Sequence, residues 1–344
     1  MKKLLLSAFT LIASCFISNA QTGNFGANYT YQINSGTYTA LTTPTVLSSG
    51  AAMDDAVFTV TLSSGFSFNG ASTTTLVVTE NGYLSVGTDP ASYNPLSNTA
   101  TGNLGIIAPF GRDLGGIDAS SELSWAEVGN EAVFQWKNVK RYSSSIGEIL
   151  NFQARLDKTT GVITFVYGTV SLASGSSTTY PQVGLRSAAT GWAANLNNLM
   201  ITNTSGNCSW QNATTGSANS STMYFDFTNS AVAPVSGLQY IWTPGTLTPP
   251  VRTIAAVSSI GTTSVVLNIT QPAGTPTGYN VQYRAVNTCS WTNAVGNPFP
   301  AAATLSVTGL SANTNYQYRI QAIYTASTSI YSHVPNSFTT LPTC

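Results

Sequence analysis

The stretch "LSANTNYQYRIQAIY", from Leu310 to Tyr324, decides the fold of the C-terminal part of the chain. Apolar side chains occupy every second position from Tyr316 to Ala322, and polar side chains stand between them. This period of two is typical of a β-strand that buries one face. The Asn-Thr before Tyr316 suits a turn. The stretch therefore predicts a turn followed by a half-buried strand.

The flanking sequence shows that this strand belongs to a larger pattern. "TTSVVLNITQP" (262–272) stands where fibronectin type III domains have their second strand, and "GYNVQYR" (278–284) matches the third. Trp291 stands where the next strand of that family often has a Trp. Residues 251–344 therefore resemble a fibronectin type III domain, which implies an immunoglobulin-like β-sandwich.

The resemblance assigns structural roles to single residues. Leu310 and Tyr316 would form the tyrosine corner, in which the Tyr hydroxyl bonds back to the backbone. Ile269 replaces a Trp that the family usually buries, so we expect a somewhat less stable sandwich. The sequence has no Arg-Gly-Asp, so the best-known integrin-binding loop of the family is absent.

The first part of the chain also consists of strand signals. "TTLVVTENGYLSVG" (74–87) places two β-rich runs around Asn81-Gly82, a dipeptide favoured in type I′ turns because both residues tolerate positive φ. "ILNFQARLDKTTGVITFVYG" (149–168) predicts a second hairpin, with its turn at 157–161. Prolines at 244, 249 and 250 mark a boundary. We expect a β-rich domain over 21–246 and a linker over 247–250.

This region resembles the nidogen-type β-rich extracellular domain. The matching pieces occur in order: "NGYLSVG", "IIAPFGRDL", "AVFQWKNV", "FQARLDKTTGVITFVYG" and "QVGLRSA". Family members tend to have Ala-Pro-Phe-Trp-x-Asp, and here Asp113 matches whereas Gly111 replaces the Trp. The resemblance implies a sandwich-like domain with an extracellular interaction role and no agreed catalytic residues. The whole chain is thus expected to be all-β, with two sandwich-like domains arranged end to end as a rod.

Composition restricts the kinds of partner. Only 7% of the 344 residues are charged, against about 25% in typical soluble domains. Three arginines and no Asp or Glu follow residue 250. There is no basic stripe of the kind that nucleic-acid binding requires, so that function is excluded.

The N-terminus predicts export. Two lysines, an apolar run and small residues over 1–20 are typical of a secretory signal peptide, with cleavage between Ala20 and Gln21. A second interpretation is a lipobox that ends at Cys15 and would anchor the protein to a lipid. No later segment approaches the length of a membrane span. We expect a secreted or cell-surface protein.

Catalytic and metal-binding patterns are weak. Cys208 precedes Trp210 at cysteine-protease-like spacing, but the sole histidine, His333, falls in the other predicted domain. Asp113 and Asp118 are the candidates for calcium, with Asp54-Asp55 and Asp89 elsewhere in the chain. No Asp-x-Asp-x-Asp-Gly loop is present, and a role as turn carboxylates explains these residues as well. Neither a zinc site nor a cofactor is predicted.

A glycosidase would need two carboxylates placed across a cleft. The local pattern around Glu122, Glu127 and Glu131 places these residues on solvent faces and turns. We therefore expect no catalytic residues.

The repeated Cys-Ser-Trp at Cys208 and Cys289 raises the question of a disulfide. In an end-to-end arrangement, the loop that holds Cys289 and the end of the chain at Cys344 lie at the same pole, away from the first domain. A bond between Cys289 and Cys344 is therefore predicted over one between Cys208 and Cys289, because Cα atoms must approach within about 7 Å.

Together these observations favour a non-catalytic adhesion or interaction module with an unknown protein or glycan ligand. A carbohydrate-binding protein, or an accessory module of a secreted glycan-degrading system, is the first alternative. The chain stops at "LPTC", directly after the last predicted strand. This favours a second alternative, the N-terminal part of a larger surface protein.

Overall fold

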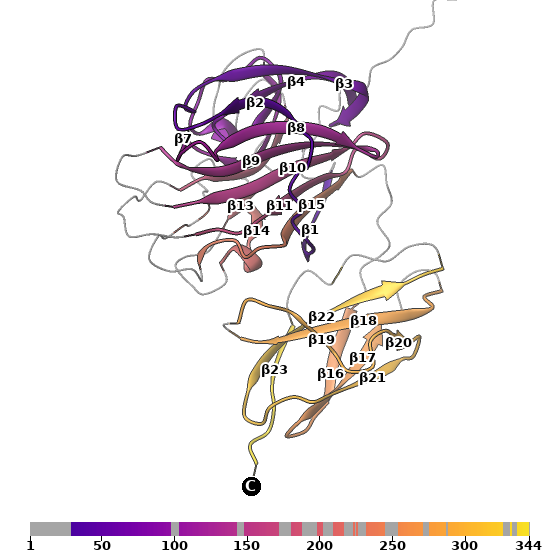
Figure 1. Ribbon diagram of the computed structural model, residues 1–344. Coiled ribbons are helices and arrows are strands. Elements are labelled where there is room, and N and C mark those ends of the chain that lie inside the picture. Colours follow the sequence, from indigo (N-terminus) through magenta and orange to yellow (C-terminus); the bar gives the residue numbers. More distant parts are fainter. Residues whose placement is uncertain are drawn as a thin grey trace, which may run out of the picture.

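The computed structural model shows two β-rich domains in chain order (Figure 1). It describes residues 29–97, 103–142, 148–171, 180–187, 198–201, 209–216, 223, 225, 232–244, 254–270, 275–286, 288–325, 331 and 336–343. The signal segment 1–20, Cys15, the linker 247–250, Cys208 and Cys344 lie outside these residues. The helical elements described are single turns, η1 (Pro95–Ser97) and η3 (Trp210–Asn212). No helix within the described part of the chain has the length and apolarity to cross a membrane.

The first domain is built from two antiparallel sheets. The larger has the strand order β1 (Tyr29–Ser35), β15 (Leu238–Pro244), β11 (Ile163–Tyr167), β10 (Leu150–Asp157), β9 (Glu131–Arg141), β8 (Glu122–Val128), β2 (Thr45–Ser49), with β7 (Leu114–Gly116) also paired to β9. The second has the order β14 (Thr214–Gly216), β13 (Asn198–Ile201), β12 (Gln182–Ser187), β6 (Asn103–Gly111), β5 (Leu84–Gly87), β4 (Ala71–Thr79), β3 (Val57–Phe68). β1 and β15 come from the two ends of the domain in sequence, and they pair with each other at one edge of the larger sheet.

A single aromatic-rich core joins the two sheets. Phe110 from β6 stacks on Phe152 from β10 with ring centroids 5.4 Å apart, and Phe152 stacks on Trp136 at 5.1 Å. All three side chains are fully or almost fully buried. Because β6 and β10 belong to different sheets, these contacts make the domain a sandwich with one continuous core.

The predicted hairpins both form, but one turn differs from expectation. At 157–161 the Asp157 carboxylate accepts the backbone N–H groups of Thr159 and Thr160, and Gly161 adopts φ +73°. Between β4 and β5 the connection is longer than the two-residue type I′ turn that Asn81-Gly82 predicted. Gly82 alone of that pair has positive φ, and the Asn81 side chain accepts a hydrogen bond from the Leu114 backbone N–H.

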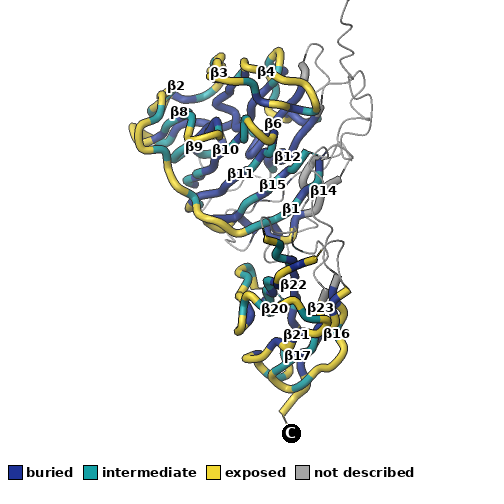
Figure 2. The backbone as a smooth tube through the Cα atoms, turned by 90° about the vertical axis from the view of Figure 1, so that its right-hand side faces the viewer, coloured by how far each residue is buried: buried dark blue, intermediate teal, exposed yellow. Residues whose placement is uncertain are grey.

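The second domain is a smaller sandwich. One sheet contains β16 (Ile254–Ile260), β17 (Ser264–Thr270) and β21 (Thr304–Thr308). The other has the order β19 (Thr292–Asn293), β18 (Gly278–Ala285), β22 (Asn315–Ile323), β23 (Asn336–Thr339), with β20 (Phe299–Pro300) also paired to β18. Figure 2 shows buried segments inside both domains and exposed ones along the loops.

The core of this sandwich contains the residues that the sequence singled out. The Tyr316 hydroxyl accepts a hydrogen bond from the Ser311 backbone N–H at 2.9 Å. Leu310, which precedes Ser311 in the sequence, is buried in the core. Tyr316 also stacks on Phe338 of β23, with ring centroids 5.7 Å apart. Ile269 belongs to the same core, so an aliphatic side chain fills part of the interior between the sheets.

Candidate binding site at the domain junction

The outer face of the β18–β22 pair is unusually rich in amides and arginines. Tyr279 and Val281 point into the core, so the alternate residues of β18 point outward. The outward set on the two strands is Asn280, Gln282, Arg284, Gln317, Arg319 and Gln321. These residues lie directly opposite one another across the strand pair. Among the residues that the structure describes, no carboxylate forms an ion pair with this face, which distinguishes it from an ordinary charged sheet surface.

Hydrogen bonds tie this face into a fixed network. Arg284 Nε donates to Gln317 Oε1 at 2.9 Å, and Arg319 Nε donates to Gln282 Oε1 at 2.8 Å. The Gln282 amide in turn donates to Asn293 Oδ1 on β19 at 2.8 Å. Each guanidinium is therefore held by an amide of the neighbouring strand, which sets the direction in which its remaining N–H groups point.

Two aromatic rings complete the arrangement. The Cζ atoms of Arg284 and Arg319 lie 4.3 and 4.5 Å from the Trp291 ring centroid. Arg319 Cζ also lies 4.3 Å from the Tyr331 ring centroid. Cation–π contacts at this distance favour the charged guanidinium and fix its plane. We call Arg284, Trp291, Arg319 and Tyr331 the arginine–aromatic ladder.

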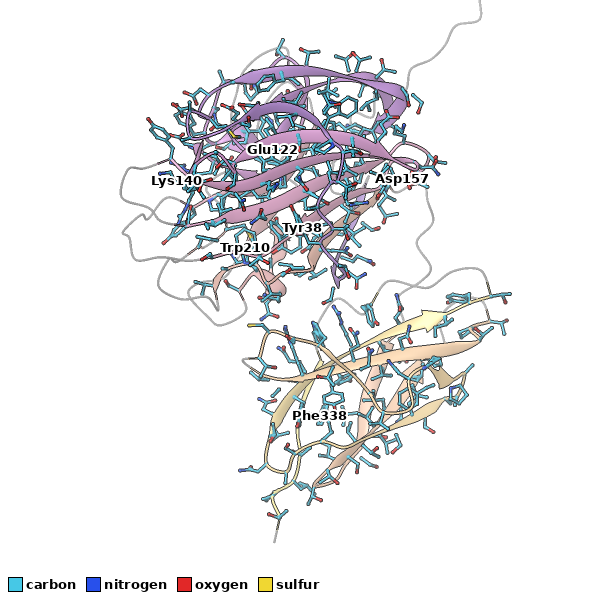
Figure 3. All side chains as sticks on the ribbon, in the orientation of Figure 1. Tyr38, Glu122, Lys140, Asp157, Trp210 and Phe338 are labelled. Carbon is cyan, nitrogen blue, oxygen red and sulfur yellow. The ribbon has the colours of Figure 1, made fainter. Side chains whose placement is uncertain are left out.

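The ladder reaches the first domain. Arg284 Nη2 donates to Asn212 Oδ1 on η3, and Arg319 Nη1 donates to the Ile33 backbone carbonyl on β1 at 3.2 Å. Figure 1 accordingly shows β18 and β22 on the side of the second domain that faces the first. In Figure 3, Trp210, which begins η3, lies at the end of the first domain nearest the second.

These contacts correct the end-to-end arrangement. Arg284 lies near the end of β18 that leads to the loop of Cys289, a loop that was expected to lie away from the first domain. Because Arg284 bonds to Asn212, this end of β18 adjoins the first domain instead. Cys289 itself is half-buried in that loop. The predicted bond between Cys289 and Cys344 is not tested, because Cys344 and Cys208 fall outside the described residues. The position of the loop beside the first domain removes the reason for preferring Cys344 and favours Cys208 as the partner.

Burial lowers the pKa values of the two ladder arginines. Arg284 and Arg319 are 2% and 5% exposed. Desolvation lowers the pKa of each to about 10, and in Arg319 the Arg284 charge lowers the pKa further while Tyr331 raises it. The ion pairs found among the described residues all lie in the first domain, such as Arg141–Glu148. The two ladder arginines thus remain charged at neutral pH without a carboxylate partner.

The calcium candidates do not come together. Asp118 accepts hydrogen bonds from the Ser120 N–H and hydroxyl, which lower its pKa, as a turn carboxylate would. Asp113 instead meets Asp54 and Asp55, and one oxygen atom of each lies within 4.8 Å of the others. Carboxylates at this spacing are donors that a divalent cation could take.

The surroundings of Asp113 disfavour its charge. Desolvation, then Asp55 and Asp54, raises the pKa of Asp113 to about 6, partly offset by Arg112. Its Oδ1 is buried without a hydrogen-bond partner among the described residues. Strand order explains this meeting, because the β2–β3 connection and the end of β6 converge, whereas the sequence separates them by some sixty residues.

Two of the three glutamates considered for hydrolysis have cationic partners. Glu127 accepts hydrogen bonds from Lys158 Nζ at 2.6 Å and from Ser63, which lower its pKa to about 2. Glu131 forms an ion pair with Arg155. A carboxylate held by a cation is a poor proton donor, so the geometry gives no support to an acid–nucleophile pair here.

Sequence reasoning missed one buried ion pair. Arg141 and Glu148 are 1% and 0% exposed, and Arg141 Nε donates to Glu148 Oε1 at 3.0 Å. The Arg141 guanidinium also lies over the Phe225 ring, 4.6 Å from its centroid. The only available signal was that both charges flank a strand pair in an otherwise weakly charged chain.

The fold and the junction define a two-domain all-β protein whose second domain presents an arginine-bearing sheet face to the first. The chain belongs to the NIDO-related family, whose model matches residues 28–244. The model of the fibronectin type III domain matches residues 249–336. No curated protein matches the chain.

Among solved structures, the chain is similar to a fibronectin type III domain of human collagen XX, with 21% identity, 27% of this chain and 93% of that chain covered, and a TM-score of 0.23. It is also similar to a structure of titin kinase and its flanking domains, with 26% identity, 27% of this chain and 17% of that chain covered, and a TM-score of 0.24.

Proposed function

We propose that the protein is a non-catalytic extracellular or cell-surface adhesion or interaction module, and that it binds its ligand at the domain junction. The arginine–aromatic ladder carries this proposal. It joins residues of both domains, and ligand sites occur preferentially at domain interfaces. A NIDO-related domain followed by a fibronectin type III domain supports an interaction role. Export through the signal segment 1–20, with cleavage between Ala20 and Gln21, is part of the same proposal.

A carbohydrate-binding protein is the second candidate. Amides and arginines across β18 and β22 offer hydrogen-bond donors and acceptors of the kind that sugars use. In this arrangement Trp291 contacts two guanidiniums, so polar groups and not an open aromatic platform would carry recognition.

The test uses the chain from Gln21 onward on arrays of glycans and of extracellular matrix proteins. We expect binding by the wild type, and loss of most of that binding in the Trp291→Ala variant. Arg155→Gln, which breaks an ion pair in the first domain, serves as the matched control and should bind normally.

Hits confined to glycans would favour the carbohydrate-binding candidate, and hits on proteins would favour adhesion. Two results would reject the proposal. One is equal binding by Trp291→Ala and wild type, and the other is the absence of any ligand together with turnover of a polymer substrate.

A further inference from the structure

The junction contains guanidinium nitrogens that lack partners. Arg284 Nη1 and Arg319 Nη2 are buried, and neither has a hydrogen-bond partner among the described residues. Every other N–H-bearing nitrogen of the two guanidiniums has a partner, as described above. A buried donor without a partner costs its full desolvation energy, and more when it is charged. One donor on each arginine is therefore available.

The charge of the junction points in the same direction. Both guanidiniums lie over the same Trp291 ring. Burial disfavours the charged form of each, which is why the pKa values of both groups are lowered. The second domain has no Asp or Glu that could compensate them. A buried cation that lacks a counter-charge is strongly unfavourable, and cation–π contacts compensate only part of its cost.

The first domain has an unpartnered polar side chain next in sequence to its contact with Arg284. Gln211 precedes Asn212 on η3, is 6% exposed, and has no partner for either amide atom among the described residues. Asn212 bonds to Arg284, so η3 supplies both a contact across the junction and a buried amide next to it in sequence. The free donors on Arg284 and Arg319 therefore adjoin a segment of the first domain that has an unpartnered polar side chain of its own.

We propose that the junction binds an oxyanion, a carboxylate or sulfate group of an acidic ligand, through Arg284 and Arg319. Guanidinium N–H groups match the oxygen atoms of both groups in geometry and charge. Because both arginines are covered, the anion enters when the domains separate locally and its binding then joins them. This inference rests on the proposed function and adds the chemistry of the ligand.

The test measures small anions, so it needs no macromolecular ligand. Thermal unfolding and titration calorimetry of the chain from Gln21 onward are carried out with sodium sulfate, sodium acetate and sodium chloride at equal ionic strength. We expect sulfate or acetate to raise the melting temperature by about 2–4 °C over chloride. The anion that gives the larger shift in melting temperature shows whether the site prefers a sulfate or a carboxylate group.

Variants assign this effect to the junction. Arg284→Gln and Arg319→Gln should each weaken anion binding about tenfold or more and abolish the shift in melting temperature. Arg155→Gln should keep the wild-type shift. If a Gln variant does not fold, Arg319→Lys keeps the charge but replaces three N–H-bearing nitrogens with one, and it should weaken binding in the same direction.

Two outcomes overturn the inference. The first is a wild type that responds equally to all three salts, and the second is an equal shift in wild type and junction variants. Array ligands without acidic groups would also overturn it while leaving the proposed function intact. Conversely, anion binding that is accompanied by turnover of a polymer substrate and by no array ligand would reject the proposed function alone.

Discussion

Replacing Asp113 with Asn should stabilise the protein at alkaline pH. The pKa of Asp113 is raised from 3.8 to about 6 by desolvation and by Asp55 and Asp54. The gap of about two pKa units corresponds to at most about 3 kcal/mol at 1.36 kcal/mol per unit. The side chain remains partly open to solvent, so screening reduces the expected gain to about 1 kcal/mol.

The pH dependence follows from the direction of this shift. A carboxyl whose pKa is raised on folding binds its proton more tightly in the folded state. The cost of its charge is therefore fully present above pH 6 and disappears as the pH falls from about 6 towards 3.8. Asp113→Asn removes that cost, so the variant should exceed the wild type at pH 8 and match it near pH 4.

Urea denaturation at pH 8, 6 and 4 measures the difference in unfolding free energy. Asp118→Asn is the matched control, because hydrogen bonds to Ser120 lower the pKa of Asp118 and removing this carboxylate should destabilise the protein at pH 8. An Asp113→Asn variant that is less stable than wild type at pH 8, or an advantage that persists unchanged at pH 4, would refute the reasoning.

Three further expectations concern stability and covalent structure. Glu148→Gln leaves a buried guanidinium without its counter-charge and should cost about 3–5 kcal/mol in urea denaturation, and a loss below about 1 kcal/mol would contradict this. Tyr316→Phe removes one hydrogen bond to the backbone and should cost about 1–2 kcal/mol, against which an unchanged midpoint would count. Non-reducing peptide mapping should link Cys289 to Cys208, because the domains meet through the neighbouring Arg284–Asn212 contact, and a peptide linking Cys289 to Cys344 would count against that expectation.

The strands and hairpins could be predicted because they depend on local pattern. Alternation from Tyr316 to Ala322 determined which face of β22 is buried, and the Asp157–Gly161 turn was specified by side-chain bonds to its own backbone. The junction could not be predicted in this way. Arg319 donates a hydrogen bond to the backbone carbonyl of Ile33. Because every residue has a backbone carbonyl, nothing in the sequence marks Ile33 as the partner.

The side-chain clusters also depend on contacts between residues that are distant in the sequence. The sequence named Asp113 and Asp118 as the calcium candidates and noted Asp54 and Asp55 elsewhere in the chain, but it gave no reason to place these two beside Asp113. The sheet order instead brings Asp54 and Asp55 to it. Trp291 was recognised as a strand residue of the sandwich, whereas its contact with two arginines depends on the diagonal placement of Arg284 and Arg319 across β18 and β22.

The central claim is that the outer face of β18 and β22 holds the second domain against the first. Small-angle X-ray scattering of the wild type and of the Arg284→Gln/Arg319→Gln double variant tests it most directly, under reducing conditions so that no bond of Cys289 restrains the domains. We expect the wild-type curve to fit the docked arrangement, and the variant to show a larger radius of gyration. A wild-type curve that requires separated domains, or identical curves for the two proteins, would contradict the claim.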